Sequence, residues 1–474
     1  MKKILYAAVA CALAFGHAQA GKPNILFLLA DDHSWEAMGC VNGEVKTPNL
    51  DRLAAGGVSF RNAYNMGAWA GAVCVSSRHM FNMGRYVWHC DELIETAKKE
   101  KKRGEAEAVK IESWSQRMHD AGYTTYFAGK WHVDYYDPKV VFDRVGTERP
   151  GMPRQTKEGY NRPLSKDDKN WLPWDESKGG YWQGGRHWSE VLRDEAVGFI
   201  EEAGEKPEPF FMYIAFNAPH DPRQAPKEYV DMYPTESIKV PENVLPRYPY
   251  DKYIGCDESL RDARLAPFPR TEYSIRVNRR EYYALITHMD AQIGKILEAL
   301  EKSGKLDNTY VIYTADHGLA NGHHGLMGKQ NMYEHSLGAP LIINGPGLEP
   351  GKRVTSRVYI QDVVPTTLEL AGQKVSGEIE FHTLLPLAKG ETDKGRETIY
   401  GAYKNLQRCV IKDGWKLIHY PDASVYRLYN LEKDSLEMSD LSANPEYAAK
   451  LAALKTELAE EMKRQSDPLL RGED

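Results

Sequence analysis

Charged and imidazole side chains follow four short apolar runs of this chain, each at the point where the run ends. The runs are rich in aliphatic and aromatic residues and predict four buried strands, Asn24–Ala30, Thr124–Ala128, Phe210–Phe216 and Tyr310–Ala315. The side chains that follow them are Asp31, Asp32, Lys130, His132, His220, Asp316 and His317. Ligands of open α/β sheets bind beyond the carboxyl ends of the strands. We therefore expect these groups to converge on one face of the sheet, where clustered titratable groups form a functional site.

Helical patterns separate the four predicted strands, which predicts an α/β fold with a large central, mostly parallel sheet flanked by helices. A chain of 474 residues exceeds the size at which one hydrophobic core stops growing, so we expect a second, smaller unit. From about Thr383 onward, segments 408–419 and 426–431 predict antiparallel strands and segment 445–463 predicts a helix. We therefore expect a large domain over residues 21–382 and a C-terminal α+β subdomain with an antiparallel sheet over residues 383–474.

The N-terminus has the pattern of a signal peptide. Lys2 and Lys3 precede an apolar run from Ile4 to Phe15, and Ala18-Gln19-Ala20 supplies small residues for cleavage after Ala20. We expect residues 1–20 to be removed and the protein to be periplasmic or secreted. The apolar run is shorter than the ~20 residues of a membrane-spanning helix, and no later run reaches that length, so no membrane span is expected.

Charge and cysteine content exclude two further classes of protein. A net charge of -6 and a pI of about 6.2 give no electrostatic footprint for nucleic acid. Five cysteines follow the predicted cleavage site, too few for a disulfide scaffold in a chain of this length. Their odd number means that at least one is unpaired or chemically special.

Two long segments, 137–188 and 233–270, lack regular periodicity. The first contains Trp171, Trp174, Trp182 and Trp188, which favours a functional loop over disorder. Its aromatic rings could stack on a sugar face. Arg186 and His187 in the same segment are candidates for binding the hydroxyls of a substrate.

The segment 71–79, which contains Cys74 and Arg78, resembles the signature of the type I sulfatase family, written C-x-P-S-R in most members. Further segments resemble motifs of that family in the same order along the chain: Thr47 to Ala54, Met83-Gly84-Arg85, Gly129-Lys130-Trp131-His132, Ala218-Pro219-His220, Asp316-His317-Gly318, Gly322 to Glu334 with Lys329, and Leu428-Tyr429-Asn430-Leu431. The chain is thus identified as a member of this family, within the alkaline phosphatase superfamily, and 21–382 would be its catalytic domain.

The resemblance implies that Cys74 is oxidised to formylglycine by a separate maturation enzyme. It also implies a calcium ion held by Asp31, Asp32, Asp316, His317 and the modified Cys74. Carboxylates suit calcium, a hard cation with about 6 to 8 oxygen ligands, whereas a nitrogen ligand is less typical of it.

The family also implies the roles of the remaining site residues. Lys130 and Lys329 would bind the sulfate oxygens, and Arg78 would hold the formylglycine hydrate. His132 would accept the proton of the second hydroxyl of the hydrate, and His220 would protonate the departing alcohol. Together these roles predict hydrolysis of an O-sulfate ester to an alcohol and free sulfate.

The chain departs from the family pattern at Ser76, which stands where most members have proline or sometimes alanine. The maturation enzyme reads this position, so Ser76 bears on the conversion of Cys74. We expect a small serine to fit where alanine is tolerated.

Three functions remain to be distinguished. The first is hydrolysis of a carbohydrate sulfate, for which the tryptophan-rich segment offers stacking surfaces. The second is a phosphatase or phosphodiesterase on the same fold, which typically uses a serine or threonine nucleophile and two zinc ions. The third is a sulfated-glycan-binding protein with unmodified Cys74, for which a proton donor such as His220 would be superfluous.

Overall fold

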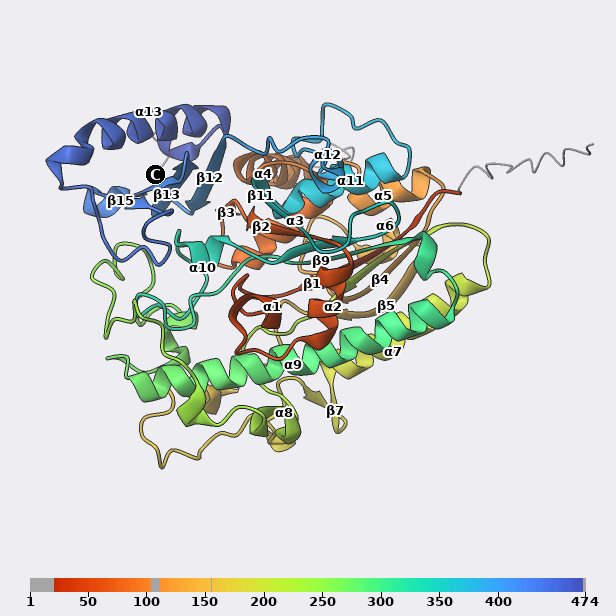
Figure 1. The fold of residues 1–474 in the computed structure, drawn as a ribbon, viewed down its shortest axis with the longest axis horizontal. Helices are drawn as coiled ribbons and strands as arrows, with labels where there is room; N and C mark the ends of the chain where they lie inside the picture. The colour runs from red at the N-terminus through yellow and green to blue at the C-terminus, as the bar shows by residue number, and fades with distance from the viewer. Residues whose placement is uncertain (1–20, 104–110, 155, 472–474) are drawn as a thin grey trace, which may run out of the picture.

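The computed structural model describes residues 21–103, 111–154 and 156–471 (Figure 1). The predicted signal peptide, 1–20, lies outside the described residues. Among the described residues, no helix is both long enough and apolar enough to cross a membrane.

An eight-stranded sheet forms the centre of the molecule (Figure 1). Its strands, in spatial order, are β11 (Lys352–Tyr359), β2 (Val58–Tyr64), β10 (Leu341–Asn344), β9 (Thr309–Ala315), β1 (Asn24–Ala30), β8 (Phe210–Ala215), β4 (Thr124–Lys130) and β5 (Arg144–Arg149). All pairs are parallel except those of β10 with β9 and β2. The predicted mostly parallel sheet is confirmed.

The four strands predicted from apolar runs are β1, β4, β8 and β9, and they are direct neighbours in the order β9-β1-β8-β4. Every residue of β1, β8 and β9 is buried. A parallel strand covered by helices on both faces has no solvated side, so it is apolar throughout instead of alternating. This is why simple runs of apolar residues located these strands to within two residues at either end.

Helices cover both faces of the sheet (Figure 1). One layer contains α1 (Gly39–Asn42), α2 (Pro48–Gly56), α7 (Trp188–Gly204), α8 (Lys227–Asp231) and α9 (Glu272–Lys302). The other contains α3 (Val73–Met83), α4 (Val87–Arg103), α5 (Trp114–Asp120), α11 (Val363–Leu370) and α12 (Leu385–Lys389). The short elements α6 (Pro138–Val141), α10 (Glu334–Leu337), β6 (Trp182–Gln183) and β7 (Arg186–His187) interrupt the loops.

A second sheet of five strands lies beside the first and is mostly antiparallel. Its order is β15 (Val425–Asn430), β14 (Trp415–Tyr420), β13 (Gln407–Lys412), β12 (Thr398–Tyr403) and β3 (Gly67–Ala68), and α13 (Ala448–Arg464) packs on it. The predicted segment 408–419 is two strands joined at Asp413-Gly414, where both residues have positive φ as a tight hairpin requires.

The second sheet is not built from the C-terminal part alone, because β3 precedes α3 in the chain. Gly67 in β3 has a φ of 88°, and a Cβ there would lie 1.8 Å from the carbonyl oxygen of Ala402. The close approach of β3 to β12 therefore requires glycine. This pairing fixes the segment that leads into α3, while a domain boundary at 382/383 stays a prediction.

Candidate active site

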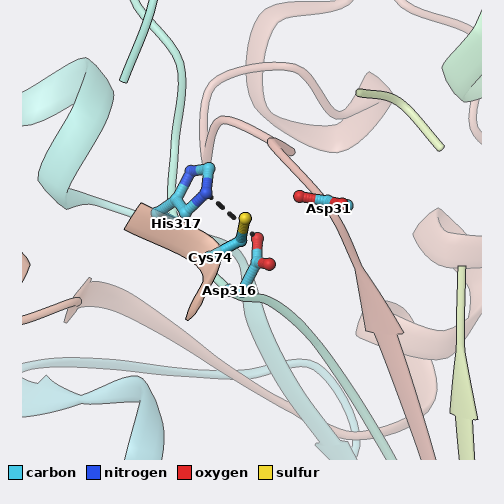
Figure 2. A group of neighbouring side chains, drawn as sticks. All are labelled: Asp31, Cys74, Asp316 and His317. Carbon is cyan, nitrogen blue, oxygen red and sulfur yellow. Dashed lines mark ion pairs between the residues drawn. The ribbon is translucent and has the colours of Figure 1, made fainter. Parts of the chain in front are cut away.

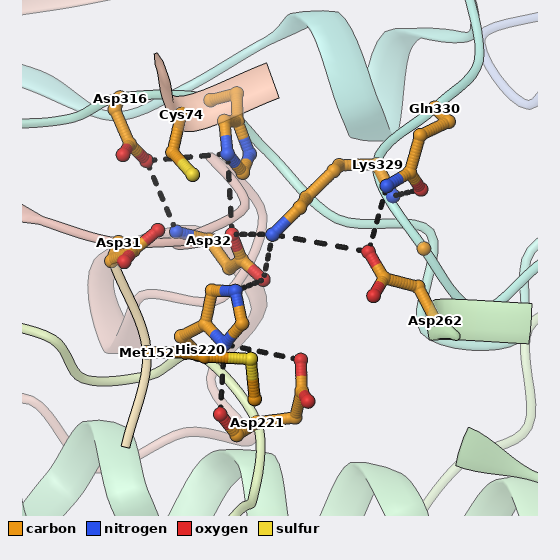
Figure 3. Close-up of polar contacts among 12 residues, drawn as sticks. Asp31, Asp32, Cys74, Met152, His220, Asp221, Asp262, Asp316, Lys329 and Gln330 are labelled. Atoms are coloured by element: carbon orange, nitrogen blue, oxygen red, sulfur yellow. Dashed lines mark hydrogen bonds and ion pairs between the residues drawn. The ribbon is translucent and has the colours of Figure 1, made fainter. Parts of the chain in front are cut away.

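The carboxyl ends of β9, β1, β8 and β4 bring the predicted groups together at one edge of the sheet (Figures 2 and 3). We call these groups the strand-end cluster: Asp31, Asp32, Lys130, His132, His220, Asp316 and His317. Helix α3 adds Cys74 and Arg78, and the loop after β9 adds Lys329. All of these side chains except His132 are at most 3% exposed.

Backbone conformation helps to aim two members of the cluster. Asp32 and His132, each just past a strand end, have φ values of 68° and 56°. Non-glycine residues rarely adopt this region, and such strain concentrates at functional sites. Near the end of β4, Gly129 has a φ of 102°, and a Cβ there would lie 1.9 Å from the carbonyl oxygen of Ala215 in β8. Glycine thus allows the close strand pairing that places Lys130.

Four donor groups lie close enough together to hold one cation. Ligand atoms of Asp31, Cys74, Asp316 and His317 lie within 4.8 Å of one another (Figure 2). The Cys74 sulfur stands here for the oxygens that a formylglycine hydrate would carry. Asp31 Oδ1 and His317 Nε2 are buried and accept or donate no hydrogen bond. His317 Nε2 lies 3.2 Å from Asp32 Oδ1 and 3.4 Å from Asp316 Oδ1. Buried polar atoms are normally hydrogen-bonded, so these two atoms without a hydrogen bond fit a bound metal ion.

The charges of the three aspartates also fit a cation. Burial raises the pKa of Asp32 well above its ordinary value, and repulsion from the Asp31 and Asp316 carboxylates adds to this shift, even though Lys329 opposes it. Burial and Asp316 also act to raise the pKa of Asp31, but Lys130, His220 and Arg78 lower it overall. A divalent cation would supply the positive charge that three buried carboxylates need to be ionised together.

Two buried lysines pair with the aspartates. Lys329 Nζ lies 2.8 Å from Asp32 Oδ1 and 3.0 Å from Asp32 Oδ2 (Figure 3). Lys130 pairs with Asp31. Although burial opposes the charged form, Asp32 and Asp262 raise the pKa of Lys329 well above its ordinary value, so this lysine stays cationic.

Arg78 connects three parts of the site. Its Nε donates to Asp316 Oδ2 at 3.0 Å, and its Nη1 donates to the Lys130 carbonyl at 2.6 Å. Its Nη2 has no hydrogen-bond partner although it is buried. One donor of the guanidinium therefore remains for a further group in the site.

The two histidines of interest lie in different surroundings. His132 Nδ1 lies 3.3 Å from Cys74 Sγ, and burial, with Lys130 and Arg78, lowers the pKa of His132 to about 4. His220 is fully enclosed, and burial, followed by Lys329, holds its pKa well below the ordinary value. Its Nε2 lies 4.0 Å from Asp32 Oδ2. Both imidazoles are therefore neutral in the unliganded protein at neutral pH.

His132 connects this buried site to the outside. A pocket of about 410 Å³ begins at its ring and is lined by Trp131, Asp137, Glu148, Arg149 and other residues. Gly151 packs directly against the ring, since a Cβ there would lie 2.4 Å from the imidazole. The buried site is thus polar, and His132 lies between it and this pocket.

A sequence profile described as "Sulfatase" matches residues 23–373 of the chain. The chain belongs to the sulfatase family. A second profile, described as "N-sulphoglucosamine sulphohydrolase, C-terminal", matches residues 322–465. The family and the α/β fold expected from the sequence are both confirmed, and the enzyme class is that of the sulfuric ester hydrolases.

Relatives align with nearly the whole chain. An N-acetylglucosamine-6-O-sulfatase of Bacteroides thetaiotaomicron is 25% identical, with 94% of this chain and 87% of the relative covered. A choline-sulfatase of Rhizobium meliloti is 27% identical, with 90% and 83% covered. The family therefore includes relatives that act on different alcohols at similar sequence distance.

Solved structures show the same fold. A structure described as a complex with its substrate D-glucosamine-2-N,6-O-disulfate has a TM-score of 0.72 at 24% identity and covers 94% of this chain and 98% of its own. A phosphonate monoester hydrolase from Silicibacter pomeroyi has a TM-score of 0.73 at 20% identity, with 94% and 96% covered. At these identities the likeness establishes the fold alone.

Two predicted substrate-binding residues of this sulfatase are not part of the cluster. His187 is fully buried at the N-terminus of α7, where Nδ1 accepts from the Ser189 amide and Nε2 contacts the Gln224 carbonyl. Both ring nitrogens are therefore occupied within the fold. Arg186 lies in the β6–β7 hairpin, is half exposed and pairs with Asp194.

Two tryptophans of the irregular segment, Trp171 and Trp188, contact arginine side chains of the protein. The Arg162 guanidinium lies 3.9 Å from the ring centre of Trp171, and that of Arg149 lies 4.4 Å from the ring centre of Trp188. These cation–π contacts cover ring faces that the sequence suggested for sugar stacking. Trp171 and Trp188 therefore contact arginines of the protein itself.

Sequence reasoning missed a group of polar residues behind His220 and Lys329. We call Tyr160, Asp221, Arg261 and Asp262 the loop group. Asp262 Oδ2 lies 3.9 Å from Lys329 Nζ and accepts from Gln330 Nε2 at 2.8 Å (Figure 3). Three of the four belong to the segments 137–188 and 233–270, which have no periodicity that could have placed them. Asp221 lies outside both segments, and its only signal in the sequence is its position directly after His220.

Proposed function

We propose that this protein is an exported, calcium-dependent sulfatase that hydrolyses an O-sulfate ester of a carbohydrate to the alcohol and free sulfate. The observation that supports it best is the buried group of Asp31, Cys74, Asp316 and His317, flanked by Lys130 and Lys329. Such a site combines ligands for a cation with two fixed positive charges for a small anion.

Asp31, Asp32, Asp316, His317 and the modified residue 74 would hold the calcium ion. When bound, the ion would polarise the reacting oxygens and neutralise charge that develops on the sulfate during transfer. Lys130 and Lys329, which pair with Asp31 and Asp32, would turn toward the sulfate oxygens. Because both lysines are buried, their attraction for sulfate is weakly screened by solvent.

Residue 74 would act as the nucleophile after oxidation to formylglycine, whose hydrated form carries two hydroxyls. His132 is placed to take a proton from one of them, because its Nδ1 lies 3.3 Å from the Cys74 sulfur. A neutral imidazole has the free lone pair that this step needs. The unpaired Nη2 of Arg78 would hold the other oxygen.

His220 would protonate the departing alcohol from the opposite side of the sulfate. In the unliganded site, Lys329 and Lys130 both disfavour the protonated imidazole. A bound sulfate would neutralise these two charges, which favours protonation of His220 as substrate arrives. An alkoxide is a poor leaving group, so this proton is needed for unactivated sugar sulfates.

The carbohydrate substrate is supported by relatives. One full-length relative is named an N-acetylglucosamine-6-O-sulfatase, and one structural neighbour is described with a disulfated glucosamine. Export and a maturation enzyme that converts Cys74 belong to the same proposal. Ser76 is fully buried in the first turn of α3, and its hydroxyl has no hydrogen-bond partner.

A screen of the matured protein against defined sulfated mono- and disaccharides, with free sulfate as the readout, tests this function. We expect calcium-dependent sulfate release from at least one sugar. Because phosphonate hydrolases share the fold, an aryl phosphate and an aryl phosphonate belong in the same screen. Turnover of either that equals or exceeds turnover of the aryl sulfate would favour the phosphatase or phosphodiesterase alternative. Binding of sulfated sugars without release, by protein that carries the aldehyde, would favour the glycan-binding alternative.

A further inference from the structure

His220 is held on one side by the residue that follows it. Its Nδ1 lies 2.8 Å from the backbone carbonyl oxygen of Asp221 and 3.1 Å from the Oδ1 atom of the same residue (Figure 3). A carbonyl oxygen only accepts hydrogen bonds, so Nδ1 carries a proton. Nε2 is then the nitrogen that faces the site, on the side of Asp32.

A second contact supports the same assignment. Arg261 Nη2 lies 3.5 Å from His220 Nε2. A guanidinium has donors and no acceptor, so an Nε2 with a lone pair is compatible with this neighbour, whereas an Nε2–H would oppose it. The two contacts together describe an imidazole with a proton on Nδ1 and a free Nε2.

Asp221 is itself fixed by two irregular segments. The side chain is 2% exposed. The Tyr160 hydroxyl donates to Asp221 Oδ2, and Arg261 Nη2 donates to Asp221 Oδ1 at 3.2 Å. Tyr160 comes from the first irregular segment and Arg261 from the second. Both long loops therefore meet at the carboxylate behind His220.

Arg261 also links this carboxylate to the sulfate-binding side. Its Nη2 donates to Asp262 Oδ1 at 2.5 Å, and Asp262 faces Lys329. One guanidinium thus spans the two aspartates that support His220 and Lys329. A partly buried charge network of this kind holds side chains more rigidly than isolated surface pairs do.

We propose that Asp221 is a positioning residue for the sulfatase reaction. It holds the Nδ1 side of His220 so that Nε2 faces the leaving oxygen, and Tyr160 and Arg261 fix its carboxylate. The proposal rests on the proposed function of His220. Substrate binding favours uptake of a second proton from solvent at Nε2, as set out above. As an oxygen of residue 74 bonds to sulfur and the S–O bond to the alcohol breaks, the leaving oxygen keeps the bonding electron pair and takes this proton from Nε2, and the ring returns to the neutral form with its proton on Nδ1. Asp221 exchanges no proton in this step, since it only orients the ring that does.

The variant Asp221→Asn tests this role because asparagine keeps the size of the side chain but removes the carboxylate. On a sugar sulfate that the wild-type enzyme turns over, we expect kcat to fall about 10-fold to 100-fold, which is within the range for general acid–base groups. On nitrophenyl sulfate, whose leaving group barely needs a proton, we expect a much smaller loss and an unchanged KM. Equal losses on both substrates, or no loss on either, would overturn the proposal.

Two further variants guard against a general effect on folding. Tyr160→Phe removes only one hydroxyl donor to Asp221, and should show the same selective loss at a smaller size. Asp251→Asn is the control, since Asp251 is 5% exposed and pairs with Arg247 in the second irregular segment. We expect the control to keep wild-type selectivity between the two substrates. If Asp221→Asn does not fold, Tyr160→Phe alone decides the question.

A readout that needs no activity separates this proposal from the proposed function. Nitrogen NMR of ¹⁵N-histidine-labelled protein, with His220 assigned by His220→Gln, should show the Nδ1–H tautomer in the wild-type protein. An Nε2–H tautomer would overturn the positioning role. Absence of sulfate release from every ester tested would instead contradict the proposed function. The NMR measurement of the His220 tautomer would then be the remaining test of the positioning role of Asp221.

Discussion

The strand-end cluster and the loop group contact each other at His220 but are held in different ways. Members of the cluster follow adjacent strands of one sheet, so backbone pairing of β9, β1, β8 and β4 sets the distances between them. Three members of the loop group come from irregular segments and Asp221 follows His220, and all four are held by side-chain contacts with one another. The residues proposed to hold the metal ion and the sulfate therefore lie on a rigid scaffold, while His220 and Lys329 are also contacted by residues from loops.

This difference predicts a gradient of effects, with the largest losses in the cluster. Asp316→Ala removes a carboxylate that faces the metal position and holds Arg78. The metal contributes several kcal/mol of charge stabilisation, and ~1.4 kcal/mol corresponds to a factor of ten in rate. We expect turnover to fall by about 10³-fold or more, and calcium depletion to have the same effect. Full activity of the chelated protein in a sulfate-release assay would show that the ligand assignment is wrong.

His220→Ala should have the next largest effect, and the size should depend on the substrate. A general acid contributes about 10²-fold or more, so sugar sulfates should lose at least that factor. Nitrophenyl sulfate should lose far less because its leaving group is stable as an anion. Steady-state kinetics on both substrates measures the ratio, and a ratio near one would remove His220 from the acid role.

Asp262→Asn should have a smaller effect that is the same for both substrates. Asp262 supports Lys329, which would bind the sulfate group that all substrates share. A hydrogen bond or ion pair to a charged group contributes about 1.5–3 kcal/mol, so we expect roughly a tenfold loss in kcat/KM. Comparison with Asp221→Asn sharpens the distinction between the two aspartates. A loss confined to the sugar sulfate would instead place Asp262 with His220.

A third buried ion group, which joins the two sheets, should change stability with little effect on activity. Glu437 accepts from the Glu334 amide at 2.8 Å and lies 2.6 Å from Lys416 Nζ. Burial, followed by repulsion from Glu334, raises the pKa of Glu437 to about 7 despite Lys416. The folded protein therefore binds this proton more tightly than the unfolded chain does.

The sign of the pH effect follows from that raised pKa. The stabilisation from Glu437 should be fully present below its ordinary pKa and be lost as pH rises through about 7. We expect a higher melting temperature at pH 5 than at pH 8 from this group, and Glu437→Gln should weaken that difference. Thermal unfolding of both proteins across this range is the measurement, and an unchanged pH dependence in the variant would contradict the assignment.

The sequence predicted the strand-end cluster but not the loop group. Apolar runs located β1, β4, β8 and β9 because these strands are buried on both faces, and the position of Asp31, Lys130, His220 and Asp316 followed from parallel pairing. The pairing of β3 with β12 was not predictable, since a strand of two residues leaves no periodic signal.

The loop group could not be predicted for a related reason. Asp262 is an ordinary turn residue in sequence, and only the path of its irregular segment brings it to Lys329. Asp221 is next to His220 in sequence, but no pattern indicated that its carboxylate contacts the ring. The roles of Arg186 and His187 stay a prediction, because a loop without a motif offers no rule for which polar residues face the site. Side-chain contacts between loops are set by tertiary packing, which local patterns do not encode.

The central claim is that residue 74 carries the nucleophile after oxidation, and peptide mass spectrometry of protein from the native host tests it most directly. We predict an aldehyde at residue 74 in protein that releases sulfate from a sugar, and a folded but inactive Cys74→Ala variant. An aldehyde-free, inactive protein would point to Ser76 as a barrier to conversion, which Ser76→Pro should relieve. Unmodified Cys74 in fully active protein would contradict the account.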